Sequence, residues 1–208
     1  MPGKKKKFLR QGRRLRIIGG TAKGYPIKTP HDRHTRPTLS RVRQAVFDIL
    51  AAEIMGASFL DLFAGCGSVG LEALSRGAGK VVFVEKNPAN CALIRQNLKG
   101  AGLGAKAAIW CLDVRRALNR LKAQKASFDV VFADPPYEQG WLKELGEKLA
   151  GADILAPGGA FLVQASVRDA PDLEEPARLL LIREYRYGNT RLLFYRCPGG
   201  GETFAERQ

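Results

Sequence analysis

Four consecutive residues, Asp134-Pro135-Pro136-Tyr137, combine groups that could activate an exocyclic amine on a nucleic-acid base. Such an amine is a poor nucleophile, because its lone pair is delocalised into the ring. The Asp134 carboxylate and the Pro135 carbonyl would accept its two N–H groups and direct the lone pair at a sulfonium methyl group. The two prolines fix a rigid turn, and Tyr137 would stack on the extruded base. The segment predicts catalysis by positioning and electrostatics; the alternative is a structural Pro-Pro turn with an aromatic lid.

A glycine-rich turn at 61–70 follows one predicted strand and opens a predicted helix. Its GxGxxG spacing serves dinucleotides and S-adenosylmethionine equally, and Glu85, which ends the next strand, would bind ribose hydroxyls. Asp61 stands four residues before Gly65, where a methionine ammonium group could lie and a pyrophosphate would be repelled; the alternative is a helix N-cap or turn residue. Asp113 would either reach an adenine amine or cap the helix that follows. The turn alone does not separate the two kinds of cofactor.

Alternating apolar runs and helix-period stretches would bring these residues together. We expect strands at 58–63, 80–85, 106–112, 128–133 and 158–165, helices at 68–77, 87–99, 114–125 and 139–150, and a closing hairpin of 179–187 and 190–196. This order predicts an α/β, Rossmann-like, seven-stranded and mostly parallel sheet, because strand-helix alternation builds parallel sheets and Gly188-Asn189 is a hairpin turn. Ligands bind such sheets beyond the carboxyl ends of the strands.

The residues before the sheet form a separate appendage. A short β-hairpin from 15–18 and 25–29 is expected to project from the main domain, and a helix follows at 39–52, capped by Thr38 or Ser40. We therefore expect four segments: a basic tail at 1–14, an N-terminal hairpin and helix at 15–53, a catalytic domain at 54–198 and a C-terminal tail at 199–208.

Nearly all of the net charge of +14 is N-terminal. Residues 1–43 hold fourteen Lys or Arg and one acid, a net +13, whereas residues 44–208 hold twenty against nineteen, a net +1. A nucleic-acid partner follows, because neutralised phosphates release counterions; a solubilising basic tail is the alternative. The residues expected to contact nucleic acid are Arg16, Lys23, Arg36, Thr38, Arg41 and Arg43.

Several other classes of protein are disfavoured by the composition. No apolar run approaches the roughly 18 residues that cross a bilayer, and the basic start lacks the apolar segment of a signal peptide, so we expect a cytoplasmic, monomeric protein that does not bind membranes. The four cysteines form no CxxC pair, and His31 with His34 is a poor ligand set. No metal site is therefore expected.

With these residues in view, the chain resembles the class I, Rossmann-like methyltransferases, and more closely the bacterial 16S rRNA (guanine-N2) methyltransferase family. The resemblance covers 15–196 and rests on these motifs: Leu15-Arg-Ile-Ile-Gly-Gly20, Arg36-Pro-Thr38, Arg41-Val-Arg43, Asp61-Leu-Phe-Ala-Gly-Cys-Gly67, Gly70-Leu-Glu-Ala-Leu-Ser-Arg76, Asp134-Pro-Pro-Tyr137 and Tyr187-Gly-Asn-Thr190. It implies catalysis at Asp134–Tyr137 and contacts between the appendage and small-subunit rRNA or the assembled small subunit. It also implies S-adenosylmethionine as cofactor, held by Asp61, Phe63, Gly65, Gly67, Glu85, Lys86, Asp113 and Val114.

Three alternatives stay open at this point. A DNA adenine or cytosine amino-methyltransferase would use the same acceptor pair, although few residues remain here for its separate target-recognition domain. A nicotinamide oxidoreductase would use the same glycine-rich turn but has no evident use for Asp134–Tyr137. A ribosome-binding protein that has lost catalysis would not need both motifs.

Overall fold

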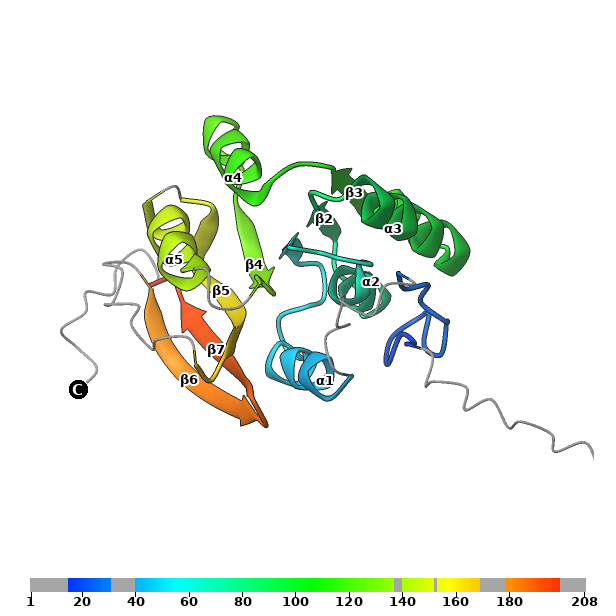
Figure 1. Cartoon of the computed structure of the whole chain (residues 1–208), viewed down its shortest axis with the longest axis horizontal. Coiled ribbons are helices and arrows are strands. Elements are labelled where there is room, and N and C mark those ends of the chain that lie inside the picture. Colours follow the sequence, from blue (N-terminus) through cyan, green and yellow to red (C-terminus); the bar gives the residue numbers. More distant parts are fainter. Residues whose placement is uncertain (1–14, 31–39, 137–139, 152, 169–178, 199–208) are drawn as a thin grey trace, which may run out of the picture.

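A seven-stranded sheet with helices on both faces positions the candidate residues (Figure 1). The computed structural model describes residues 15–30, 40–136, 140–151, 153–168 and 179–198. The strands are β1 (Ser58–Leu62), β2 (Lys80–Val84), β3 (Ala107–Trp110), β4 (Phe128–Ala133), β5 (Leu155–Ser166), β6 (Leu180–Tyr187) and β7 (Thr190–Arg196). The helices are α1 (Ser40–Ile49), α2 (Ser68–Ser75), α3 (Pro88–Ala101), α4 (Val114–Ala123) and α5 (Trp141–Gly151), with a short 3₁₀ turn, η1 (Gly104–Lys106).

The strand order is β3-β2-β1-β4-β5-β7-β6. The first five strands along the chain are parallel to one another, whereas β7 runs antiparallel to both β5 and β6. The central strands β1 and β4 are apolar runs covered by helices on both faces, as parallel strands require. Gly188, at a φ of 61°, makes the turn between β6 and β7. The predicted parallel sheet with an antiparallel closing hairpin is confirmed.

Two apolar cores lie on opposite faces of the sheet. One core packs α1, α2 and α3 against the sheet and contains Phe47, Leu71 and Ile94. The other packs α4 and α5 against the opposite face and contains Leu118 and Leu145. Figure 1 shows the same division, with α4 and α5 on one side and α1, α2 and α3 on the other. The helices thereby hold the carboxyl ends of the strands in fixed relative positions.

Gly70 explains how closely α2 lies against β2. A Cβ atom at Gly70 would stand 2.3 Å from Cε1 of Phe83, so no larger residue fits without displacing that ring. Gly67, at a φ of 81°, turns the chain into α2. The glycines of the GxGxxG segment therefore do two of the jobs such glycines perform, a tight turn and close helix–strand packing.

Most boundaries match the predictions to within a few residues, but β5 begins at Leu155 rather than 158. Leu155 pairs with Phe128 before the register of β4 and β5 shifts. The chain then passes through Gly158, whose N–H donates to the Cys197 carbonyl, and Gly159, whose carbonyl accepts from the Cys197 N–H, each at 3.0 Å. These hydrogen bonds extend the strand across a Pro-Gly-Gly segment that sequence patterns mark as a break.

The N-terminal hairpin packs against the main domain instead of projecting from it, so that prediction was wrong. Its two arms pair only through a bridge between Arg16 and Pro26 and adjacent backbone hydrogen bonds. Other backbone N–H groups of the hairpin donate to the main domain. The Thr21 N–H donates to the Ser75 carbonyl at 2.7 Å, and the Lys28 N–H donates to Asn97 Oδ1 at 2.8 Å. The hairpin is therefore clamped onto α2 and α3.

Buried Glu72 of α2 is the main anchor of this clamp. Its carboxylate accepts the backbone N–H groups of Ile18 and Gly19, both at 2.7 Å, and the Arg76 guanidinium at 2.8 Å. Arg43 of α1 is also buried, with its Nε 3.7 Å from Glu72 Oε2 and its Nη2 donating to the Arg16 carbonyl at 2.5 Å. Burial lowers the pKa of Arg43, an effect that Glu72 opposes. One buried carboxylate thus joins the hairpin, α1 and α2.

Glu72→Gln is expected to lower the free energy of unfolding by about 3 kcal/mol, because removing one partner of a buried ion pair leaves the other charge uncompensated. Glutamine keeps the shape and one acceptor but leaves Arg43 without a buried counter-charge. Urea unfolding measures the change. Glu53→Gln is the control: it breaks a partly exposed pair with Arg196 and should cost less than about 1 kcal/mol. Equal losses in the two variants would contradict the role given to Glu72.

Candidate cofactor and base site

The glycine-rich turn leaves β1 through two residues with left-handed backbone conformations. Phe63 has a φ of 60° and Gly65 a φ of 56°. A non-glycine residue rarely adopts this conformation, which marks strain of the kind that gathers at functional sites. The Ala64 N–H donates to the Val84 carbonyl at 3.0 Å and ties the turn to β2. A Cβ atom at Gly65 would meet nothing within 4 Å, so the chain leaves open space on that side of the turn.

Three carboxylates gather around this turn from three adjacent strands. Asp61 lies near the end of β1, Glu85 follows β2 and Asp134 follows β4. Asp61 is buried and accepts the Gly70 N–H of α2 at 2.9 Å. Burial raises its pKa to about 8, the Gly70 N–H opposes this rise, and the charges of Asp134 and Glu85 add to it. A cation placed here would relieve the repulsion among the three groups.

Glu85 connects the glycine-rich turn to the next helix. Its Oε2 accepts the Gly65 N–H at 2.8 Å, and its Oε1 accepts the Asn87 N–H at 2.7 Å. Asn87 in turn caps α3, because its side chain accepts the Ala89 N–H at 2.9 Å. The backbone contacts hold the Glu85 carboxylate in place and leave further lone pairs on both oxygens as acceptors. Binding of a ribose by Glu85 stays a prediction.

Asp113 caps the helix that follows it, which is one of the two roles expected for this residue. Its side chain accepts the Arg115 N–H at 2.9 Å and caps α4. Val114, the next residue, is buried, whereas Lys86, which follows the neighbouring strand β2, is exposed. The contact of Asp113 with an adenine amine stays a prediction, and a cap fixes the carboxylate at the rim where that contact would occur.

The segment after β4 lies next to the segment after β1. β4 pairs with β1, and the Asp134 N–H donates to the Leu62 carbonyl at 3.4 Å, which extends the pairing one residue beyond the strand. Asp134 is half-buried, Pro135 is buried and Pro136 is exposed. Tyr137 lies outside the described residues, so its stacking role stays a prediction. Asp134 therefore stands at the carboxyl edge of the sheet, in the position that an α/β fold gives to ligand-binding groups.

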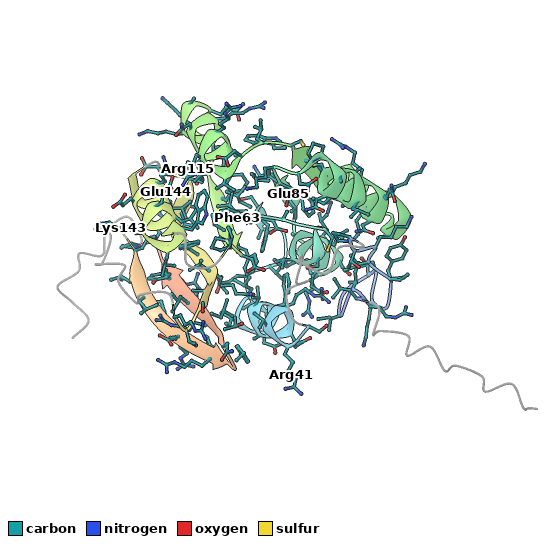
Figure 2. All side chains as sticks on the ribbon, viewed as in Figure 1. Arg41, Phe63, Glu85, Arg115, Lys143 and Glu144 are labelled. Carbon is teal, nitrogen blue, oxygen red and sulfur yellow. The ribbon has the colours of Figure 1, made fainter. Side chains whose placement is uncertain are left out.

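A cluster of four side chains braces this edge, and only Phe63 among them was predicted from the sequence as a site residue. The Phe63 ring meets the Trp141 ring edge-on at 4.8 Å, and the Arg115 guanidinium lies 4.1 Å from the Trp141 centroid. Arg115 also donates two hydrogen bonds to Glu144, each at 2.7 Å. Figure 2 shows Arg115 and Glu144 side by side, with Phe63 toward the centre of the molecule. The cluster links the glycine-rich turn to the starts of α4 and α5.

The predicted nucleic-acid residues divide into three groups. Arg16, Lys23 and Arg41 are exposed, and Figure 2 shows Arg41 pointing away from α1. Arg36 and Thr38 lie in the part of the chain that the structure does not describe. Arg43 is fully buried against Glu72, so its predicted contact with RNA was wrong. Its guanidinium instead contacts Glu72 and the Arg16 carbonyl within the protein.

The described residues contain neither a metal-binding cluster nor a membrane-spanning helix. No group of three or more His, Cys, Asp or Glu side chains in these ranges is placed to hold a metal ion. Over the same ranges, no helix combines the length and apolar character that a membrane span needs.

Comparison with known families accounts for this arrangement. The family model described as "Conserved hypothetical protein 95" matches residues 15–196, which include both the appendage and the sheet. The chain belongs to this family. The matched range is the one over which the sequence resemblance was recognised.

Individual relatives cover nearly the whole chain. "Putative rRNA methyltransferase YlbH" of Bacillus subtilis is 32% identical over 89% of this chain and 100% of its own length. "Ribosomal RNA small subunit methyltransferase D" of Escherichia coli is 33% identical over 92% of this chain and 94% of its own. The solved structure of "Putative methyltransferase yhhF" from Escherichia coli superposes with a TM-score of 0.76 at 32% identity, over 89% of this chain and 99% of that one.

Proposed function

We propose that this protein transfers the methyl group of S-adenosylmethionine to the exocyclic N2 of a guanine in small-subunit ribosomal RNA. The observation that carries the proposal is the meeting of Asp61, Glu85 and Asp134 at the carboxyl ends of adjacent strands, beside the open side of Gly65. The names of the relatives, which are rRNA and small-subunit rRNA methyltransferases, support RNA as the substrate.

The residues present fit this cofactor. Its ammonium group and sulfonium are both positive, and the buried Asp61 with its neighbouring carboxylates supplies the matching negative charge. Glu85 would hold the ribose hydroxyls, and Asp113 would accept the adenine amine. When bound, S-adenosylmethionine supplies a methyl group attached to a positively charged sulfur. A dinucleotide fits less well, because its pyrophosphate would lie among carboxylates.

Asp134 and Pro135 would perform the base chemistry. The Asp134 carboxylate and the Pro135 carbonyl accept the two N–H groups of the guanine amine and hold its lone pair perpendicular to the ring plane. Asp134 stabilises the positive charge that develops on the amine and then accepts a proton, directly or through water. Pro136 keeps the turn rigid, and Tyr137 stacks on the extruded base. The catalytic groups would need no covalent intermediate.

One experiment tests the whole proposal. The protein is incubated with labelled S-adenosylmethionine and unmodified small ribosomal subunits, naked 16S rRNA or duplex DNA, and the modified nucleosides are identified by mass spectrometry. We expect N2-methylguanosine from an RNA sample and no product from DNA. N6-methyladenine or N4-methylcytosine would overturn the choice of base, and labelled DNA would overturn the choice of polymer.

The appendage is expected to bind RNA through its exposed cations. Lys23→Gln/Arg36→Gln/Arg41→Gln should weaken binding of naked 16S rRNA and make its salt dependence shallower, by about one unit of slope for each phosphate that is no longer neutralised. Fluorescence anisotropy across a salt series measures both quantities. S-adenosylmethionine affinity is the control for folding. Unchanged RNA binding would contradict a role for the appendage.

A further inference from the structure

The near-neutral charge of residues 44–208 conceals a strongly basic segment. Residues 86–125 hold nine Lys or Arg and one acid, Asp113, for a net charge of +8. Residues 44–85 hold two basic and five acidic side chains, and residues 126–208 hold nine and thirteen. The catalytic region therefore has its own charge asymmetry, separate from that of the N-terminus.

This segment forms one edge of the molecule. It comprises α3, η1, β3 and α4, and β3 is the edge strand, with α3 on one face of the sheet and α4 on the other (Figure 1). All nine cations are exposed. We call them the β3-edge surface: Lys86, Arg95, Lys99, Lys106, Arg115, Arg116, Arg120, Lys122 and Lys125.

Few of these charges are used within the protein. Among the residues that the structure describes, Arg115 alone of the nine forms an ion pair, with Glu144. Arg120 lies 4.4 Å from the centroid of the half-exposed Trp110 ring, which orients the guanidinium without neutralising it. A charged face that served only solubility would carry both signs interspersed. A field of one sign attracts a polyanion.

The cations in the first turn of α4 work against the stability of that helix, unlike Arg120 and Lys122 in its last turn. Arg115 and Arg116 occupy its first turn, where cations oppose the helix dipole by about 0.3–1 kcal/mol each. Arg116 and Arg120 are four residues apart, a spacing at which like charges repel. Arg115 is held by Glu144 and Trp141, and Arg120 lies in the last turn, where the dipole favours a cation. Folding does not account for Arg116, whereas a ligand with negative charge does.

The β3-edge surface adjoins both the candidate site and the appendage. Lys86 directly follows Glu85, and Arg115 lies two residues after Asp113, so α3 and α4 begin at the rim where cofactor and base would bind. On the other side, Lys28 of the appendage donates to Gln96 Oε1 of α3 at 3.2 Å. The exposed cations therefore continue from the appendage, across α3 and β3, to α4.

We propose that the β3-edge surface is a second contact surface for the phosphate backbone of the substrate RNA, which would run from the appendage past the candidate site to α4. This inference rests on the proposed function, since it takes RNA as the substrate. The ligand it requires is a polynucleotide that extends well beyond the target guanine, because the cations extend along the whole sheet edge. Its contacts position the RNA and carry no base specificity.

Two triple variants with equal loss of charge test the proposal. Arg116→Gln/Arg120→Gln/Lys122→Gln removes three cations of α4 and keeps Arg115 in its cluster with Trp141. Arg168→Gln/Arg183→Gln/Arg186→Gln removes three exposed cations at the β5–β6 end of the sheet, away from the surface. Binding of naked unmodified 16S rRNA is measured by anisotropy from about 50 to 200 mM salt, the range over which phosphate contacts dominate the change in affinity. S-adenosylmethionine affinity and thermal midpoint are measured for both.

The α4 variant should bind RNA about tenfold more weakly than wild type near 100 mM salt, with a salt slope shallower by about two to three. The control variant should stay within about twofold of wild type, because its charges lie away from the RNA path. Both should bind S-adenosylmethionine normally. Equal RNA affinities in the two variants would overturn the β3-edge proposal while leaving the proposed function intact. A wild type that neither binds nor methylates RNA would overturn the proposed function and, with it, this inference.

Discussion

Replacing Asp134 with Ala is expected to lower kcat for methyl transfer by at least about 10²–10³-fold, the usual effect of removing one group that stabilises developing charge. The amine would lose the acceptor that holds one N–H and the carboxylate that balances its positive charge. S-adenosylmethionine affinity should change little, because the ammonium group is assigned to Asp61. Asp134 raises the pKa of Asp61, so its removal makes the Asp61 carboxylate slightly easier to ionise. Cofactor binding is therefore not expected to weaken.

Single-turnover methylation of small-subunit RNA and calorimetric titration of the cofactor separate these two effects. Asp129→Asn is the matched control, since Asp129 is an exposed carboxylate on the same strand at its opposite end, held by Ser58 at 2.7 Å. It should retain wild-type turnover. An active Asp134→Ala enzyme would refute the role given to Asp134. A variant that loses cofactor affinity in proportion to activity would move Asp134 into the cofactor site.

The parts of the site that sequence predicted are those fixed by local chain geometry. The turn after β1 and the segment after β4 each follow a buried strand directly, so their place at the carboxyl edge follows from the strand order alone. Glu85 is placed by the same reasoning. The roles of these residues toward cofactor and base are predictions that the cofactor and activity measurements address.

Contacts between distant segments could not be predicted in this way. Arg43 stands among the exposed cations of a basic stretch, yet it is buried because Glu72, twenty-nine residues later, offers a buried counter-charge. The cluster of Trp141 with Phe63 and Arg115 likewise joins three segments that are separate in sequence. The sequence shows which of these residues are charged or aromatic. Only the packing decides which of them face RNA, solvent or the core.

The second large effect concerns Asp61. Its burial suits the binding of a cation, but the same burial makes the ionised carboxylate unfavourable when no cation is bound. Its pKa is raised to about 8, well above the ordinary value of 3.8 for an aspartate. Between these two values the unfolded chain has released the proton and the folded chain has kept it. Ligand-free protein therefore loses about 1.4 kcal/mol of stability per pH unit through this group as the pH rises from about 4 to 8.

Asp61→Asn is expected to remove that loss and to abolish tight cofactor binding. Asparagine still offers an oxygen to the Gly70 N–H but carries no charge, so the ligand-free variant should be more stable than wild type at pH 8. S-adenosylmethionine affinity at pH 8 should fall by at least about 100-fold, the cost of leaving a desolvated charge unpaired. Thermal unfolding and calorimetric titration, each at pH 6 and pH 8, measure the two changes. The stability gap between the variant and wild type should be smaller at pH 6.

Wild type should show the matching pH dependence. Cofactor binding requires the ionised carboxylate, so binding below pH 8 releases a proton and affinity falls by about tenfold per pH unit as the pH drops. Titrations in buffers of different ionisation enthalpy count that proton directly, and Asp61→Asn should release none. If wild type binds equally well at pH 6 and pH 8 without releasing a proton, Asp61 is not the group that receives the ammonium. Its burial would then serve only the hydrogen bond that joins β1 to α2.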